Sequence, residues 1–230
     1  MVVVPSTAMA SSYGQFCPVA VACEVLTERW TPLVLRELLA GSRRFNDLQR
    51  GVPMMSPSLL TKRLRTLERA AIVERVGGEY VLTAAGGELR PIIEGIGEWG
   101  QRWSRGQLDD ERLDAALLMW DIHRRIDSGS VPAGRLVVHF QLGGSPRAKS
   151  RFWLVLEDGQ VDLCLSDPGH EVDLTVRGHL RDIAAYWTGR ADIGELVRGG
   201  ALDLDGPPRL VRAFPTWFLR SAFAEVPSAV

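Results

Sequence analysis

The chain has 230 residues, which is enough for two domains that each bury a core of their own. Hydrophobic residues make up 46% of it and charged residues 24%, as is typical of soluble globular proteins, and the net charge of −1 excludes a chain that is strongly basic or acidic throughout. No stretch of 18 apolar residues occurs, which excludes a membrane-spanning helix and leads us to expect a cytoplasmic protein with no membrane partner.

The N-terminal segment and the cysteines carry no sign of secretion. Residues 1–16, MVVVPSTAMASSYGQF, have no basic segment and only a short apolar run, so we expect a mobile leader rather than a signal peptide. The three cysteines, Cys17, Cys23 and Cys164, lack C-x-x-C spacing, which argues against a disulfide framework and against a zinc site.

The first helices are predicted over residues 17–30, 31–41 and 44–51, where apolar residues recur at helical spacing. A fourth helix is predicted to begin at Ser56, which is a good N-cap residue. Pro57 then takes the first helical position, where its missing N–H costs nothing.

This fourth helix has two unlike sides. At 100° per residue, its leucines point one way, and the polar residues opposite them are Ser58, Thr61, Lys62, Arg65 and Arg69. Residues 43–75 contain eight basic residues against three acidic ones, a local positive excess in a nearly neutral chain. The helix is therefore expected to dock by its leucines and to offer a cationic side to a polyanion, the alternative being an ordinary solvated face.

A hairpin and a long helix are predicted next. Two β-rich runs within residues 72–83 flank Gly77-Gly78, a two-residue turn that favours primed geometry. Thr83 then starts a predicted helix that ends at Trp103 and carries a broad apolar stripe. Pro91 is expected to kink this helix, and Gly95, Gly97 and Gly100 weaken it. Close packing should therefore stabilise it, with a second chain as one candidate partner.

Helices, a basic helix, a hairpin and a further helix in this order are typical of a winged helix-turn-helix. The segment from Cys17 to about Trp103 also resembles the HxlR-type transcriptional regulators. The motifs that carry the resemblance are W-T-x-L-x-L-R-E-L (Trp30–Leu38), R-x-F-x-x-L (Arg43–Leu48), S-P-x-x-L-x-x-R-L-x-x-L-E (Ser56–Glu68) and an L-T…P-I…W-G run ending at Gly100. The resemblance implies a recognition helix from Ser56 to Arg65, a homodimer, and double-stranded operator DNA as the partner.

The resemblance also implies a set of DNA-binding residues. Base edges would be met by Ser58, Leu59, Lys62 and Arg63, phosphates would be held by Arg43, Arg44, Arg65 and Arg75, and Ser56 and Thr61 complete the DNA-binding set. The wing is shorter than is common in the family, so we expect a phosphate contact at most from Arg75. The dimer contact is expected on the first helix and on residues 83–103.

Cys17 stands just before Pro18, at the start of the first predicted helix. Some members of the family sense electrophiles or oxidants through a cysteine in this context, which makes Cys17 a candidate redox sensor. Such sensing needs an exposed thiol with a lowered pKa, and a helix N-terminus helps to lower that pKa. The alternative is a small hydrophobic side chain that packs the helix, and no resolving cysteine stands at an obvious position.

The polar stretch Ser104–Glu111 is the expected domain boundary, so we place one domain at residues 17–106 and a second at 107–230. In the second domain, helices are predicted over 111–127, 179–190, 192–200 and 207–223, and strands over 135–142, 151–158, 160–166, 171–178 and 201–206. The pattern predicts an α+β fold with a mostly antiparallel sheet. The consecutive apolar residues 152–156 further predict apolar cover on both faces of that sheet, from helices or from a lipophilic ligand.

Residues from roughly Leu113 to Ala224 resemble sterol-carrier-protein-type domains. The resemblance is carried by the strands WLVLEDGQVDLCLSDPGHEVDLTVRG and by the segment WTGRADIGELVRGGALDLDGPPRLVRAF. It implies an apolar pocket for a small hydrophobic ligand, and the residues expected to line it are Trp120, Phe152, Trp187, Trp217 and Phe218. The alternative is that these aromatic residues fill an ordinary core.

The sequence contains no catalytic constellation. Its four histidines show no metal-ligand spacing, and it has neither a nucleophile motif nor a phosphate-binding glycine loop. Asp167, His170, Glu171 and Asp173 share a loop that could bind a metal, but a solvated turn is the simpler interpretation. We expect no enzyme, no cofactor and no metal site.

Our hypothesis is a dimeric transcriptional regulator whose second domain binds a small hydrophobic effector. The alternative is a carrier or scavenger of hydrophobic ligands whose winged helix serves only for dimer or protein contacts. The basic excess over residues 43–75 favours the regulator, because a contact module has no need of it.

Overall fold

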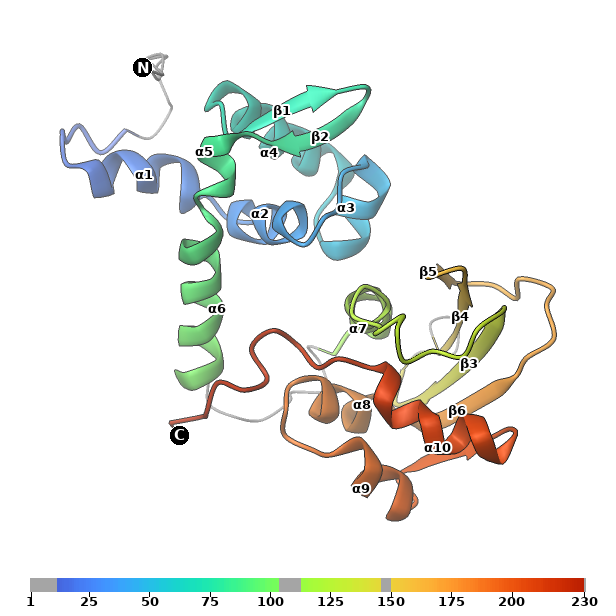
Figure 1. The fold of residues 1–230 in the computed structure, drawn as a ribbon. Helices are drawn as coiled ribbons and strands as arrows, with labels where there is room; N and C mark the ends of the chain where they lie inside the picture. Colours follow the sequence, from blue (N-terminus) through green and yellow to red (C-terminus); the bar gives the residue numbers. More distant parts are fainter. Residues whose placement is uncertain (1–11, 104–112, 146–149, 230) are drawn as a thin grey trace. The chain divides into compact units, whose positions relative to one another are not determined.

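The structure is a computed structural model that describes residues 12–103, 113–145 and 150–229. The chain divides into two compact units, one that runs to Gly97 and one that begins at Glu98 (Figure 1). Each unit has its own hydrophobic core. Residues 1–11 of the predicted leader and the predicted boundary at Ser104–Glu111 lie outside the described residues.

The N-terminal unit contains helices, a two-stranded hairpin and the start of a long helix, in the predicted order. Its elements are α1 (Pro18–Leu26), α2 (Thr31–Leu39), α3 (Phe45–Gly51), α4 (Pro57–Arg69), β1 (Val73–Val76), β2 (Glu79–Leu82), α5 (Ala84–Gly87) and α6 (Arg90–Trp103), the last of which continues past Gly97. Its core is formed by buried residues of α2, α3, α4, the hairpin and α6.

The two sides of α4 are fixed by its sequence. Ser56 Oγ accepts a hydrogen bond from the Leu59 backbone N–H at 3.3 Å, and Pro57 occupies the first helical position. The leucines of its inner side are all but fully buried. Because each buried leucine contributes about 1.5–3 kcal/mol, the polar side of α4 is left facing outward.

The hairpin has the short turn that the sequence predicts. β1 and β2 pair antiparallel, and Gly77 and Gly78 between them have φ values of +59° and +89°. A primed turn needs such left-handed values, which glycine adopts without strain. The Tyr80 N–H donates to the Arg43 carbonyl at 2.8 Å, so the hairpin is tied to the connection between α2 and α3.

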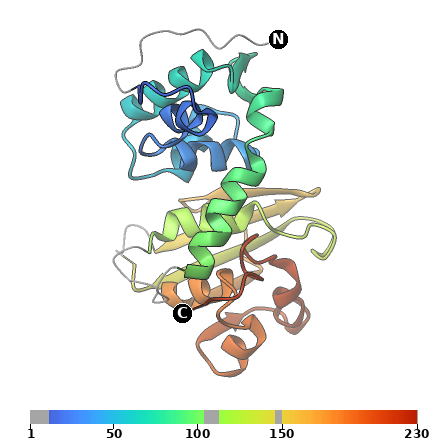
Figure 2. The ribbon, with the colours of Figure 1, turned by 90° about the vertical axis from the view of Figure 1, so that its left-hand side faces the viewer.

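The single kinked helix predicted from Thr83 to Trp103 is wrong, because two helices occupy this segment. Thr83 caps α5 by accepting a hydrogen bond from the Gly86 N–H at 3.2 Å, and α6 starts afresh at Arg90. Pro91 therefore lies in the first turn of α6, where the lack of an N–H removes no helical hydrogen bond. After this break α6 is one continuous helix (Figures 1 and 2).

The C-terminal unit is built on a five-stranded mixed sheet. Its elements after α6 are α7 (Ala115–His123), β3 (Leu136–Gly143), β4 (Arg151–Glu157), β5 (Gln160–Cys164), β6 (Leu174–His179), α8 (Leu180–Trp187), α9 (Ile193–Arg198), β7 (Leu202–Asp205) and α10 (Pro208–Trp217). The strand order is β5-β4-β3-β6-β7, with only the β3–β6 pair parallel among these five strands. The predicted α+β fold with a mostly antiparallel sheet is confirmed.

The helices of this unit share one core with one face of the sheet. Alternate residues of β3 and β4, among them Phe140 and Phe152, pack with side chains of α7, α8, α9 and α10. On the opposite face the His139 ring stacks on Trp153, with centroids 4.5 Å apart and planes 4° from parallel. Val137 and Trp153 on this face are buried, with 1% and 8% of their surface exposed, and part of the cover on Trp153 is an imidazole from the neighbouring strand.

Candidate nucleic-acid interface and apolar cavity

The outer side of α4 forms a shallow, open concavity of polar and charged side chains. Its lining residues are Ser58, Thr61, Lys62, Arg65, Glu68 and Arg69. Lys62 and Arg65 are exposed, and neither is ion-paired with another residue in the described ranges. Arg69 was on the predicted polar side but outside the predicted DNA-binding set. Its position seven residues after Lys62, two turns along the helix, is the signal that could have included it.

Three residues of the predicted set help to build α4 itself. Ser56 is its N-cap, and Thr61 Oγ1 donates to the Pro57 carbonyl at 2.9 Å. Leu59 is half-buried and packs against the core of the N-terminal unit. These three residues therefore support the surface that Ser58, Lys62 and Arg65 present.

Arg63 is turned towards its own unit. Its guanidinium forms an ion pair with Glu28, and its Nε donates to the Arg29 carbonyl at 3.1 Å. Only 11% of the side chain is exposed. This placement contradicts the expectation that Arg63 meets a base edge, because its hydrogen-bonding groups are directed at the connection between α1 and α2.

The remaining predicted arginines gather around the hairpin. Arg44 Nε lies 3.3 Å from Glu79 Oε1, although 77% of the arginine side chain is exposed. The Arg75 guanidinium lies over the ring of Tyr80, 5.3 Å from its centroid. The Arg43 carbonyl accepts a hydrogen bond from the backbone N–H of the same tyrosine. Residues 79 and 80 of β2 thus contact the side chains of Arg44 and Arg75 and the backbone of Arg43, which come from two separate segments of the chain.

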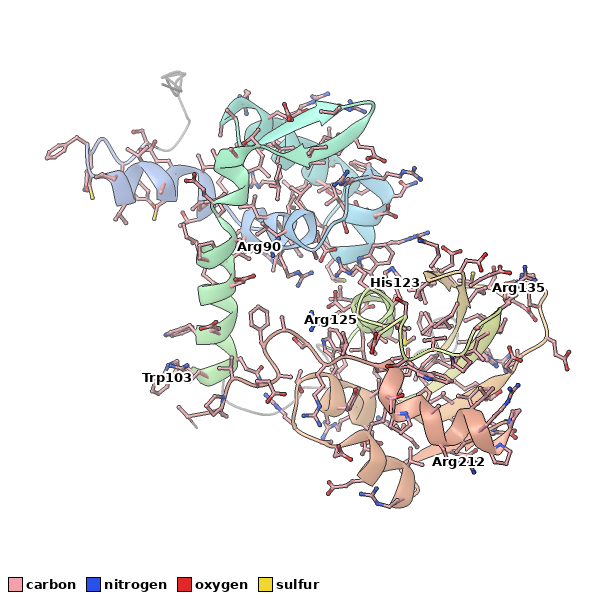
Figure 3. All side chains as sticks on the ribbon, in the orientation of Figure 1. Arg90, Trp103, His123, Arg125, Arg135 and Arg212 are labelled. Carbon is pink, nitrogen blue, oxygen red and sulfur yellow. The ribbon has the colours of Figure 1, made fainter. Side chains whose placement is uncertain are left out.

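Two helices expose apolar side chains. α1 has no buried residue, and Figure 1 shows it extending away from the other helices of its unit. Along α6, an exposed apolar stripe consists of Ile92, Ile96, Trp99 and Trp103, each between 48% and 69% exposed. Trp103 points outward from the last turn of the helix (Figure 3). Exposed apolar residues at this helical spacing are typical of a surface that packs against another helix.

The last turn of α6 is held by the C-terminal unit. Gln101 Nε2 donates to the Thr188 carbonyl at 3.1 Å, just beyond α8. The Ala229 N–H donates to the Arg102 carbonyl at 2.8 Å. The helix that carries the apolar stripe therefore ends in hydrogen bonds to the unit that contains the cavity described below.

Cys17 is the N-cap residue of α1 and is partly exposed. The backbone N–H groups of Ala20 and then Val19, which are free at the start of α1, lower the pKa of its thiol. A thiol in this position gives up its proton more readily than an ordinary one, since the helix N-terminus stabilises the thiolate.

The apolar cavity of the C-terminal unit is small and lies between the sheet and the helices. Its lining residues are Ile122, Phe140, Ile183, Tyr186, Ile193, Leu202, Phe214 and Phe218. Its volume is about 10 Å³, close to the minimum that one water needs. Of the five predicted lining residues only Phe218 takes part, which corrects the prediction for Trp120, Phe152, Trp187 and Trp217. The structure places Phe152 and Trp217 in the packed core, where they are almost fully buried.

Among the residues that the structure describes, no group of three or more His, Cys, Asp or Glu side chains is arranged to hold a metal ion. Over the same residues, no helix has both the length and the apolar character needed to cross a membrane.

Comparisons with known proteins match two separate parts of the chain. Residues 25–107 match the family model described as HxlR-like helix-turn-helix, and residues 132–218 match the SCP-2 sterol transfer family. Both resemblances expected from the sequence are confirmed by these matches.

Curated relatives match part of this chain and most of their own length. An HTH-type transcriptional regulator of Synechocystis, sll1512, is 35% identical over 130 residues, which cover 50% of this chain and 93% of that protein. The HTH-type transcriptional regulator YvaP of Bacillus subtilis is 35% identical over 98 residues, which cover 39% of this chain and 91% of that one. Among solved structures, quinone-bound YodB from B. subtilis has 34% identity and a TM-score of 0.35, and the match covers 36% of this chain and 97% of that one.

Proposed function

Because the chain belongs to the HxlR-like helix-turn-helix family, whose curated members are transcriptional regulators rather than enzymes, we propose that it is a dimeric, sequence-specific DNA-binding protein that responds to a small hydrophobic effector. The observation that carries this proposal is the outer side of α4. It exposes unpaired cations directly above a leucine side that fixes its orientation.

The chemistry of α4 fits the major groove of duplex DNA. The groove admits one α-helix, and phosphates on both of its edges attract arginine and lysine. In this proposal Ser58 and Lys62 contact base edges, Arg65 and Arg69 contact phosphates, and Leu59 lies close enough to touch a thymine methyl group. Arg43, Arg44 and Arg75 contact phosphates beside the hairpin, whose two-glycine turn is too short for deep insertion into a minor groove.

A dimer would present two such helices. The exposed apolar surfaces of α1 and of the α6 stripe support this proposal, because scattered single apolar residues are normal on a monomer but aligned stripes are not. A twofold dimer reads two half-sites about one helical turn of DNA apart, or a multiple of that.

The C-terminal unit is the proposed effector domain. Its match to the SCP-2 sterol transfer family and the wholly apolar lining of its cavity support a hydrophobic ligand. At about 10 Å³ the cavity has to open before it can hold one, so the ligand selects an expanded state. The hydrogen bonds at Gln101 and Arg102 offer a direct route from that expansion to α6.

Cys17 is a second proposed input. Its capping position and lowered pKa favour reaction with an electrophile or oxidant, and the modified side chain would alter the start of α1.

Operator binding tests the main proposal against a carrier function. A duplex site is selected from a random pool with the wild-type protein, and its affinity is then measured for the wild type and for the double variant Lys62→Ala/Arg65→Ala. The regulator proposal expects selection of a defined site and a loss of at least tenfold in the variant. A carrier would select no site, and equal binding by both proteins would remove α4 from the interface.

A further inference from the structure

The connection between α1 and α2 has an unusual backbone. The Thr31 N–H donates to the Glu28 carbonyl at 2.9 Å, which closes a tight turn with Arg29 and Trp30 at its centre. Trp30 has φ of +79° and ψ of −21°, a left-handed conformation that turns of this shape usually give to glycine. A bulky aromatic residue there is strained, and strain of this kind persists only where surrounding contacts hold it.

Arg63 of α4 supplies such contacts. Its Nε donates to the carbonyl of Arg29, the peptide group that directly precedes the left-handed Trp30, and its guanidinium pairs with Glu28. A separate contact comes from the Arg29 guanidinium, which lies over the Trp30 ring, 5.4 Å from its centroid. One planar guanidinium thus engages both the first residue of the turn and its central carbonyl, a geometry that lysine cannot reproduce.

The two kinds of contact constrain α4 differently. Its leucines hold the helix against the core, but apolar contacts have no direction and permit small rotations about the helix axis. The hydrogen bond from Arg63 Nε to the Arg29 carbonyl is directional, the ion pair with Glu28 holds the guanidinium beside it, and Arg63 lies about 100° around the helix from Lys62. Fixing Arg63 therefore fixes the direction in which Lys62 and its neighbours project.

We propose that Arg63 is a positioning residue for DNA binding, and that the clamp formed by Glu28, Arg29 and Arg63 transmits the orientation of α1 to α4. This inference rests on the proposed function. Within it, α1 carries Cys17 at its start and a proposed dimer surface along its length, so a change at either end of α1 reaches the recognition helix through Arg63.

Glu28→Gln gives the sharpest test, because electrostatics and positioning predict opposite results. Removing a carboxylate beside a DNA-binding surface raises general attraction to phosphates, so charge alone predicts equal or tighter binding. The clamp predicts that affinity for the selected operator falls about tenfold, while affinity for an unrelated duplex changes less than twofold, since misdirected side chains lose base contacts first. The slope of log K against log salt should stay at its wild-type value.

Four further variants complete the experiment. Glu74→Gln removes an exposed carboxylate from β1 of the same unit and should keep the wild-type preference for the operator. Arg63→Lys keeps the charge but cannot engage both groups, so it should lose the operator preference as Glu28→Gln does. The exchange Glu28→Arg/Arg63→Glu should recover part of the operator affinity that Arg63→Glu loses, because it restores the ion pair. Melting curves confirm that each variant is folded at the assay temperature.

The outcomes separate this inference from the proposed function. If the wild type selects no operator, the proposed function fails. If the wild type selects one and Glu28→Gln binds it as tightly, while Arg63→Lys or the exchanged pair stays defective, Arg63 contacts DNA directly and the inference is wrong. If affinity for the operator and for the unrelated duplex fell by the same factor, the clamp would act on stability alone, and the inference would also be wrong.

Discussion

Lys62 and Arg63 are neighbours in the sequence, yet they face different surroundings. Lys62 is exposed on the outer side of α4, whereas Arg63 is covered by the connection between α1 and α2. Helical spacing predicted the first placement, because it depends only on nearby leucines. It could not predict the second, since Glu28 lies 35 residues earlier and nothing local marks it as the partner of Arg63.

Single cations of α4 should reveal their roles through salt dependence. Arg65→Ala is expected to lower the slope of log K against log salt by about 1 on any duplex, because one phosphate contact is lost. Lys62→Ala, if it removes a base contact, should instead cost about 1–3 kcal/mol on the selected operator and less on altered sites. Fluorescence anisotropy over a salt series measures both. An unchanged slope for Arg65→Ala would contradict its phosphate contact, and unchanged operator affinity for Lys62→Ala would contradict its base contact.

Cys17 should react at lower pH than an ordinary thiol. Its pKa is lowered by the backbone N–H groups of Ala20 and Val19, so the reactive thiolate forms below the ordinary value of about 8.5. The rate of alkylation by iodoacetamide should therefore reach half its maximum below that pH. Peptide mass spectrometry follows the rate at Cys17 separately from the other cysteines. A half-maximum at or above 8.5 would contradict the N-cap effect.

At the scale of elements, the helices and the hairpin followed from local pattern, while their ends depended on distant contacts. The helix predicted over residues 207–223 stops at Trp217, because Phe218 adopts an extended conformation and pairs with Ile126. Tyr186 Oη also donates to the Phe218 carbonyl. These partners lie more than thirty residues away, so the sequence pattern could not indicate that the helix ends there.

The apolar stripe of α6 leads to a prediction about assembly. Ile96→Glu places a charge on a residue that is 55% exposed, so the folded chain should lose little stability while a helix-to-helix interface is broken. We expect the dimer to dissociate and operator affinity to fall sharply. Sedimentation velocity measures the first and anisotropy the second. Glu98→Ala, on the same helix, serves as the control and should leave both unchanged.

His139, on the sheet face opposite the helices, should make stability depend on pH. Burial, then Arg151, lowers the pKa of His139, outweighing Asp167, which raises it. The unfolded chain therefore binds a proton more readily than the folded chain. The free energy of unfolding is fully retained above the ordinary histidine pKa of about 6.5 and declines as pH falls below it.

His139→Asn should flatten this decline between pH 7.5 and 5.5, as measured by the urea midpoint at each pH. His170→Asn, in an exposed loop, is the matched control and should behave like the wild type. An equal decline in the His139 variant and the wild type would show that other groups cause it.

For the whole molecule, the sequence predicted the order of two family domains along the chain. It did not predict the size of the cavity or which residues line it. The aromatic residues of this half, together with the family resemblance, predicted a pocket with Trp217 and Phe152 among its lining residues. In the structure these residues fill the core, and the cavity is lined by four aliphatic residues and by the aromatic residues Phe140, Tyr186, Phe214 and Phe218. Composition gives the apolar area to be buried but not how tightly the side chains pack.

A hydrophobic effector should couple the two units. A ligand at one hundred times its dissociation constant is expected to raise the stability of the C-terminal unit by about 2.7 kcal/mol. Linkage then requires that operator DNA alter the affinity for the ligand by the same factor by which the ligand alters operator affinity. Thermal melts and anisotropy with dansyl-undecanoic acid as the probe measure both effects. A probe that raises the melting temperature without changing operator affinity would contradict the coupling.

The stripe on α6 passes from residues before Gly97 to residues after Glu98 without a break in the helix. Each inserted residue turns everything that follows by about 100°. One extra residue at this junction would swing Trp99 and Trp103 out of line with Ile92 and Ile96, whereas seven would bring them nearly back into phase. Length variation at this junction should therefore occur in steps such as seven or eleven residues, each of which leaves the stripe within about 20° of alignment.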